Sequence, residues 1–164
     1  MHSFLGNTVK PKRAIPSVAA LEAHLGFWLR FVSSHVSTRF QQLLEEKGVT
    51  VTEWVALRTM WSQAETRHTE LIQTLGMTKG AASKVVSRLE EKGLAERLRA
   101  DGQTREQALV LTAAGKALVP KLAALADAND EHFFSHLRAQ ERQSLMDAMQ
   151  ALVKHHQLKD IPTA

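Results

Sequence analysis

The chain has 164 residues, of which 44% are hydrophobic, and it contains no cysteine and no tyrosine. This length predicts one domain with at most a small addition. Without cysteine the chain has no disulfide, no thiolate nucleophile, no cysteine-bound zinc and no thiol redox sensor. It shows neither a secretory signal nor an uncharged apolar run of the roughly 18 residues that a membrane span needs, which favours a cytoplasmic protein.

The formal net charge of +4 is concentrated in two segments. Residues 1–16 carry three basic residues and no acid, and residues 66–105 carry eight basic residues against five acids. Local positive potential favours a polyanion such as DNA, although such a face is also typical of an ordinary solvated surface. Charge leaves both interpretations open, so the spacing of the residues has to decide. We expect residues 1–16 to form a flexible basic arm.

The first predicted element is a helix of about 30 residues within residues 17–47. A helix of this length is roughly 45 Å long and exceeds the core of a small domain, so part of its apolar stripe needs another cover. A second subunit is the simplest cover. Gly48 predicts a left-handed C-cap. The stripe consists of Val18, Leu21, Leu25, Trp28, Leu29, Val32, Val36, Phe40, Leu43 and Leu44.

Three shorter helices are predicted next from their capping residues. Thr50 and Glu53 form a capping box before the second helix. Thr66 is expected to cap the third helix, and Thr78 the fourth, which ends at Gly93. Trp54, Leu57, Met60 and Trp61 mark the second helix. The buried faces are Leu71, Ile72 and Leu75 in the third, and Ala82, Val85, Val86 and Leu89 in the fourth.

From Leu94 the pattern changes from helical to alternating, which predicts a β-hairpin. The D-G pair at residues 101–102 is a strong turn signal, and residues 107–112 form the returning strand. Arg97 and Arg99 are expected to project away from the apolar face of the first strand.

Two further helices are predicted after the hairpin. The first begins at Thr112, and Pro120 inside it predicts a kink. The last begins at about Arg138. Its apolar stripe consists of Leu145, Met149, Leu152 and Val153.

Two short helices joined by a glycine-containing turn and followed by a basic hairpin form a winged helix-turn-helix. The expected fold is therefore mainly α with a small β-hairpin wing. We expect a DNA-binding lobe over residues 48–112, preceded by an N-terminal dimerisation helix over residues 17–47. C-terminal dimerisation helices are expected over residues 113–164.

The predicted DNA contacts follow from the chemistry of the duplex. A recognition helix over residues 78–92 needs small side chains beside hydrogen-bond donors to enter the major groove. Helix N-termini offer amides to phosphates, and arginines of a wing over residues 94–112 can follow the backbone or enter the minor groove. The residues assigned to DNA are Arg67, His68, Thr69, Thr78, Lys79, Gly80, Ala81, Ser83, Lys84, Ser87 and Arg88 from the helices, and Arg97, Arg99, Gln103, Thr104 and Arg105 from the wing.

Two segments resemble the MarR family of bacterial transcription regulators: LGMTKGAASKVVSRLEEKGL at residues 75–94 and LVLTAAG at residues 109–115. The likeness extends over about residues 20–155. The resemblance implies a homodimeric repressor. Its terminal helices would form the dimer interface, and its two winged helices would read a pseudo-palindromic operator. The family's wing usually carries D-x-R. Here residues 103–105 are Q-T-R, so the arginine is kept and the aspartate is not.

The resemblance also implies release from DNA by a small aromatic or otherwise lipophilic anion. An aromatic wall beside an arginine or a histidine fits an aromatic acid, although tryptophans at helical spacing are more often core residues. The residues that match this effector pocket are His24, Trp28, His35, Trp54, Arg58 and Trp61.

No catalytic residue, metal site or cofactor is predicted. His132 and His136 have the i, i+4 spacing of a metal pair but lack an evident third ligand, and no nucleophile or phosphate-loop motif occurs. An enzyme is therefore not expected. The alternative to a DNA-binding regulator is a winged-helix protein-interaction module whose basic helix meets an acidic partner. The small residues on the outer face of the fourth helix favour DNA, because a protein-binding face more often exposes aromatic residues or methionine.

Overall fold

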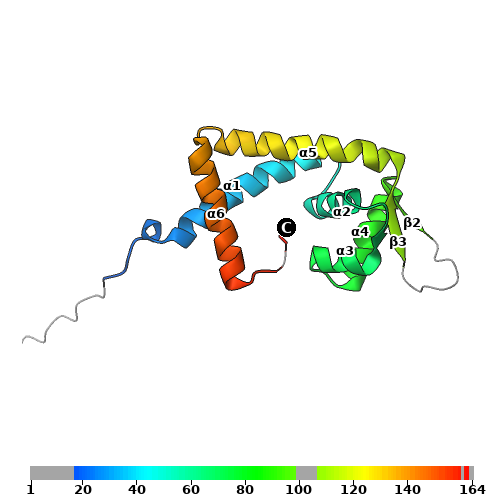
Figure 1. Cartoon of the computed structure of the whole chain (residues 1–164), viewed down its shortest axis with the longest axis horizontal. Coiled ribbons are helices and arrows are strands. Elements are labelled where there is room, and N and C mark those ends of the chain that lie inside the picture. The colour runs from blue at the N-terminus through cyan, green and yellow to red at the C-terminus, as the bar shows by residue number, and fades with distance from the viewer. Residues whose placement is uncertain (1–16, 99–106, 160, 163–164) are drawn as a thin grey trace, which may run out of the picture. The chain divides into compact units, whose positions relative to one another are not determined.

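The computed structural model describes residues 17–98, 107–159 and 161–162. The chain divides into two compact units, residues 1–33 and residues 34–164. The predicted basic arm and the D-G turn at residues 101–102 lie outside the described residues. In chain order the elements are the 3-10 turn η1 (Leu21–Ala23), α1 (Leu25–Glu45), α2 (Val51–Trp61), β1 (Thr66–Arg67), α3 (His68–Leu75), α4 (Lys79–Glu91), β2 (Ala95–Leu98), β3 (Ala108–Leu111), α5 (Ala113–Phe134) and α6 (Ala139–His156) (Figure 1). The fold is mainly α with a small sheet, as the sequence predicts.

The first helix is shorter than expected. At His24 the backbone is extended, with φ −100° and ψ 126°, so the chain makes a 3-10 turn before α1 begins at Leu25. The indole Nε1 of Trp28 donates to the carbonyl of Glu22 at 2.9 Å. This contact holds the turn against the start of α1, because it satisfies a carbonyl that a continuous helix would have bonded internally.

The caps of the next helices confirm most of the sequence prediction. The backbone N–H of Glu53 donates to Thr50 Oγ1 at 3.1 Å, and its carboxylate accepts from the Thr50 N–H at 2.9 Å, which completes the capping box of α2. Gly76 ends α3 in the left-handed region, with φ 60°, and Gly93 follows α4 with φ 69°. Both positions favour glycine because a Cβ strains this conformation.

A third strand joins the predicted hairpin. The sheet is antiparallel in the order β1-β3-β2, with Thr66 opposite Leu109 and Ala95 opposite Leu111. The prediction that Thr66 caps α3 is wrong, since Thr66 lies in β1 and is fully buried. Arg67 takes the N-cap position without a capping bond from its side chain. The local sequence resembles a helix N-cap, but the pairing of β1 with β3 determines the backbone conformation at Thr66.

The core lies in the unit of residues 34–164. Every helix from α1 to α5 and strand β3 contributes at least one side chain with no exposed surface, and burying a leucine completely contributes about 1.5–3 kcal/mol. These side chains are Leu44, Leu57, Leu71, Leu89, Leu109 and Leu122. The core holds α2 against α3, α4 and α5, and α4 against β2.

The N-terminal end of α5 packs closely on the turn before the wing. An added Cβ at Gly115 would lie 2.1 Å from the carbonyl oxygen of Leu94, so only glycine fits there. Thr112 caps the helix through the Gly115 N–H at 3.1 Å and donates its hydroxyl to the carbonyl of Gly93 at 2.6 Å. Pro120 is contained within this continuous 22-residue helix.

The last helix, α6, begins where the sequence predicts and carries the predicted stripe. Its apolar residues are 40–48% exposed, and α6 has no buried residue. The described part of residues 1–33 also exposes apolar side chains, including Leu25 (73%) and Trp28 (47%). Within the described ranges, no helix is both apolar and long enough to pass through a bilayer.

Candidate nucleic-acid interface

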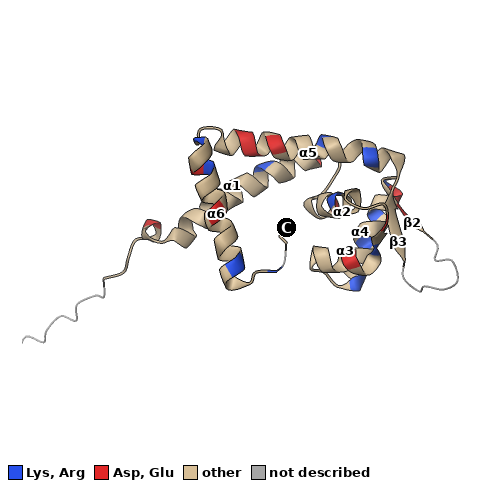
Figure 2. Ribbon diagram, viewed as in Figure 1, with Lys and Arg blue, Asp and Glu red and all other residues tan. Residues whose placement is uncertain are grey.

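Helix α4 has one buried face and one exposed basic face. Thr78 caps it by accepting a hydrogen bond from the Ala81 N–H at 3.2 Å. The predicted apolar residues of the helix are buried, and Lys79, Lys84 and Arg88 are exposed. Figure 2 shows Lys and Arg at several positions along α4. Gly80 is exposed with open space around its Cα, so this face combines donors with room for close approach.

The three residues assigned to DNA at the start of α3 differ in their exposure. Arg67 and Thr69 are exposed. The His68 side chain is buried, with only 7% of its surface exposed, and the contact of this residue with DNA stays a prediction. His68 lies three and seven residues before Leu71 and Leu75, which places it on the buried face of the helix. This spacing is visible in the sequence and predicts a buried side chain at residue 68.

The buried imidazole of His68 has an electropositive neighbourhood. Its Nε2 atom is buried and has no hydrogen-bond partner among the described residues. Burial lowers the pKa of His68, and the positive charges of Arg97 and Lys79 lower this pKa further. Both effects favour the neutral form of His68.

Arg97 lies against α4, contrary to the expectation that it projects outward from the wing. Its Nη1 pairs with the Glu90 carboxylate, and its backbone N–H donates to the same carboxylate at 3.0 Å. Its Nη2 donates to the Ser83 carbonyl at 3.1 Å and to the hydroxyls of Ser83 and Ser87 at 3.3 Å and 3.2 Å. The alternation of β2 explains this placement, because Arg97 shares a face with Ala95, which is 1% exposed and packs inward.

The three partners of Arg97 follow one face of α4. Ser83, Ser87 and Glu90 are spaced by four and three residues, so they lie in a row along the helix. Arg97 therefore connects the base of the wing to about two turns of the recognition helix. The sequence offers no local signal for this contact, because the two elements are joined only by the fold.

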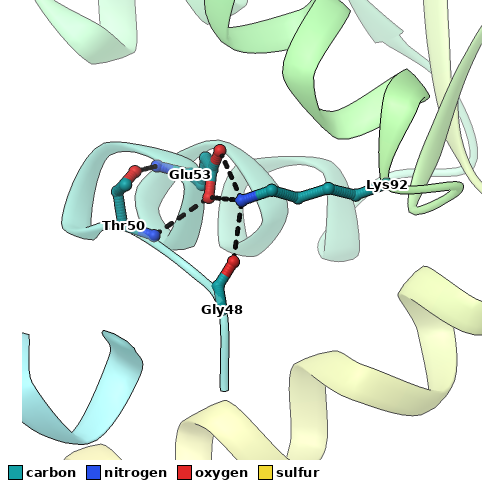
Figure 3. A network of polar contacts seen from close by, with 4 residues as sticks. All are labelled: Gly48, Thr50, Glu53 and Lys92. Atoms are coloured by element: carbon teal, nitrogen blue, oxygen red, sulfur yellow. Dashed lines mark hydrogen bonds and ion pairs between the residues drawn. The ribbon is translucent and has the colours of Figure 1, made fainter. Parts of the chain in front are cut away.

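A second polar network attaches the C-terminal end of α4 to the start of α2 (Figure 3). The ammonium of Lys92 donates to the Gly48 carbonyl at 2.7 Å and to the Glu53 carboxylate. The same carboxylate caps α2 through Thr50. The two networks together fix α4 relative to the lobe: Arg97 holds its middle, and Lys92 holds its C-terminal end.

The remaining wing residues assigned to DNA lie outside the described residues. They are Arg99, Gln103, Thr104 and Arg105. Their contact with DNA stays a prediction.

The residues assigned to an effector pocket lie in different surroundings. In the first unit Trp28 contacts Phe27 and Phe31 edge to face, and His24 lies at the end of η1. In the second unit the Trp54 ring packs edge to face on Phe40, whereas His35 and Arg58 are exposed.

Trp61 lines a pocket of about 230 Å³ at the end of α2. The other lining residues are Met60, Gln63, Ala64, Leu111 and Lys116. Lys116 supplies a cation beside an indole ring, which suits an aromatic anion. Lys116 is not among the predicted pocket residues, because nothing in the local sequence pattern brings the first turn of α5 to the end of α2. Among the residues that the structure describes, no cluster of three metal-binding side chains occurs, and His132 and His136 are exposed.

Comparison with known proteins gives a consistent result. A family model described as the MarR family matches residues 47–106. A curated relative, the HTH-type transcriptional repressor Mb2911 of Mycobacterium bovis, is 26% identical over 131 residues, which cover 80% of this chain and 94% of the relative.

Solved structures share the fold. CouR from Rhodococcus jostii RHA1 bound to p-coumaroyl-CoA aligns with a TM-score of 0.69 at 24% identity, over 82% of this chain and 95% of CouR. A mutant MarR from E. coli complexed with operator DNA aligns with a TM-score of 0.68 at 22% identity, over 79% of this chain and 93% of that one.

Proposed function

We propose that the chain is a homodimeric repressor of the MarR family that binds a pseudo-palindromic operator with α4. The relatives found are regulators of transcription, and we propose no catalytic activity. The observation that carries the proposal is the exposed face of α4, which presents Lys79, Lys84 and Arg88 and leaves open space at Gly80. Such a face supplies cations for phosphates and lets the backbone approach base edges.

The pairing of two subunits is supported by two uncovered apolar surfaces. The stripe of α6 and the start of α1 each leave large apolar side chains more than 40% exposed. Soluble monomers rarely expose contiguous apolar surface of this kind, and a second copy of the chain is the simplest cover. We therefore assign residues 17–47 and residues 113–164 to dimerisation and residues 48–112 to DNA.

Release by a small aromatic or lipophilic anion is the proposed regulation. CouR, which shares the fold, is bound to p-coumaroyl-CoA. In this chain the pocket beside Trp61 and Lys116 offers an aromatic wall and a cation. A panel of aromatic acids is expected to contain at least one that weakens operator binding. Operator affinity that stays unchanged across the whole panel would contradict this part of the proposal.

The salt dependence of affinity tests DNA binding itself. The logarithm of the affinity for a mixed duplex is expected to fall with the logarithm of salt concentration, with a slope of about −0.9 for each phosphate contact. Lys84→Met should make this slope shallower, and Lys121→Met, which removes an exposed charge from α5, should leave it unchanged. A flat slope for the wild type would favour the protein-interaction module.

A further inference from the structure

Arg97 determines which way two hydroxyls on the recognition helix can point. A guanidinium only donates hydrogen bonds, so the Oγ atoms of Ser83 and Ser87 both act as acceptors toward Nη2 of Arg97. Each hydroxyl therefore keeps its own proton for another partner. Within the described part of the chain, neither hydroxyl donates to a protein acceptor. Both serines are half-buried, at the edge between the wing and the exposed face of α4.

We propose that Arg97 is a positioning residue for base reading, which fixes Ser83 and Ser87 as hydrogen-bond donors toward the major groove. This inference rests on the proposed binding of DNA by α4. A free serine hydroxyl accepts from or donates to a base with equal ease, and therefore discriminates poorly. Because Arg97 occupies one lone pair of each oxygen, the hydroxyls favour donation to the acceptor atoms of the groove, which are N7 and O6 of guanine, N7 of adenine and O4 of thymine, over acceptance from the N4 amine of cytosine.

The surroundings of Arg97 favour a role in positioning the two serines over a direct contact with a DNA phosphate. Its side chain is 23% exposed, and its charge is paired with Glu90. Arg88 on the same helix is exposed, and no ion pair to it is found among the described residues. Loss of Arg97 should therefore change which bases are preferred, whereas loss of Arg88 should weaken binding to all sequences alike.

The test compares base preference and salt dependence in the full-length chain. Duplexes are selected from random DNA with the wild type, and dissociation constants are measured for the selected duplex, for its single-base variants and for a scrambled duplex. The proteins are the wild type, Arg97→Met, Arg97→Lys, Arg88→Met, the double variant Ser83→Ala with Ser87→Ala, and the triple variant that adds Arg97→Met. Urea unfolding of each variant identifies any protein that has lost its fold.

Arg97→Met is expected to reduce the ratio of selected to scrambled affinity about tenfold, because each neutral hydrogen bond contributes a factor of about 2 to 10. The loss should be confined to the base pairs that face the two serines, with the salt slope unchanged. Arg97→Lys keeps the charge but not the fork, so it should show the same relaxed preference even if Arg97→Met unfolds. In the double serine background, Arg97→Met should have no further effect on preference.

Two results would overturn the inference. One is an equal loss of affinity for all duplexes, with a salt slope shallower by about 0.9 for each contact removed, which would make Arg97 a phosphate contact. The other is an unchanged base preference in folded Arg97→Met and Arg97→Lys. A wild type that selects no sequence is a different outcome, since it contradicts the proposed function before Arg97 is altered.

Discussion

The ammonium of Lys92 lies 2.7 Å and 2.9 Å from the two carboxylate oxygens of Glu53, although 39 residues separate them in the chain. Glu53 is 1% exposed, and Lys92 covers it from the surface. The same carboxylate caps α2, so one buried charge serves a local and a long-range contact. A buried carboxylate is tolerated when it is both paired and hydrogen-bonded, as it is here.

Lys92→Met should therefore destabilise the lobe by about 2–3 kcal/mol, somewhat less than the 3–5 kcal/mol of a fully buried pair, since Lys92 is partly exposed. Urea unfolding monitored by circular dichroism measures the loss. Lys121→Met, which alters an exposed lysine of α5, is the matched control and should change stability by less than about 0.5 kcal/mol. Equal stability of the two variants would contradict the anchoring role of Lys92.

Gly115→Ala should destabilise the chain by about 3 kcal/mol, at the upper end of the overpacking range, because the new methyl meets the backbone carbonyl of Leu94. Gly80→Ala has open space around it and lies in a helix, so the same change there should stabilise the fold by about 0.5–1 kcal/mol. Thermal unfolding of both variants measures these opposite effects. A Gly115→Ala protein as stable as the wild type would show that α5 does not approach the wing so closely.

Stability should also depend on the protonation of His68. Its pKa is lowered in the folded state, so the unfolded chain binds a proton that the native chain refuses. The free energy of unfolding should therefore fall as the pH drops through the unfolded pKa of about 6.5, and the loss should end below the folded pKa.

The variant His68→Leu tests this dependence by unfolding at several pH values between about 7.5 and 5. Leucine continues the apolar face of α3 and removes the unpartnered Nε2, so the profile should become flatter. His132→Leu changes an exposed histidine and should keep the wild-type profile. Identical profiles for the wild type and His68→Leu would exclude His68 as the source of the pH dependence.

Sequence patterns predict the elements of this fold better than they predict its polar contacts. The caps at Thr50 and Thr78 and the glycines at residues 76 and 93 are local signals, and the structure confirms them. Thr66 was misassigned because a two-residue strand has no periodicity to detect. The alternation of β2 predicts that Arg97 lies opposite the Leu94 and Leu98 face, but no local signal shows that this second face of β2 packs on α4.

The α6 stripe makes a further prediction about assembly. Met149→Glu places a charge on the exposed apolar face, so it should convert the proposed dimer to a monomer in sedimentation experiments at micromolar concentration. Ala151→Glu adds the same charge on the opposite face of α6 and should remain dimeric. Dimers from both variants would show that α6 lies outside the interface.

Selection of duplexes from random DNA by the full-length chain tests most directly whether two copies of α4 read successive major grooves. The expected result is an inverted repeat whose half-sites are centred about 10 base pairs, or a multiple of that distance, apart. Selection that enriches no sequence, or only a single unpaired half-site, would contradict a symmetric DNA-binding pair.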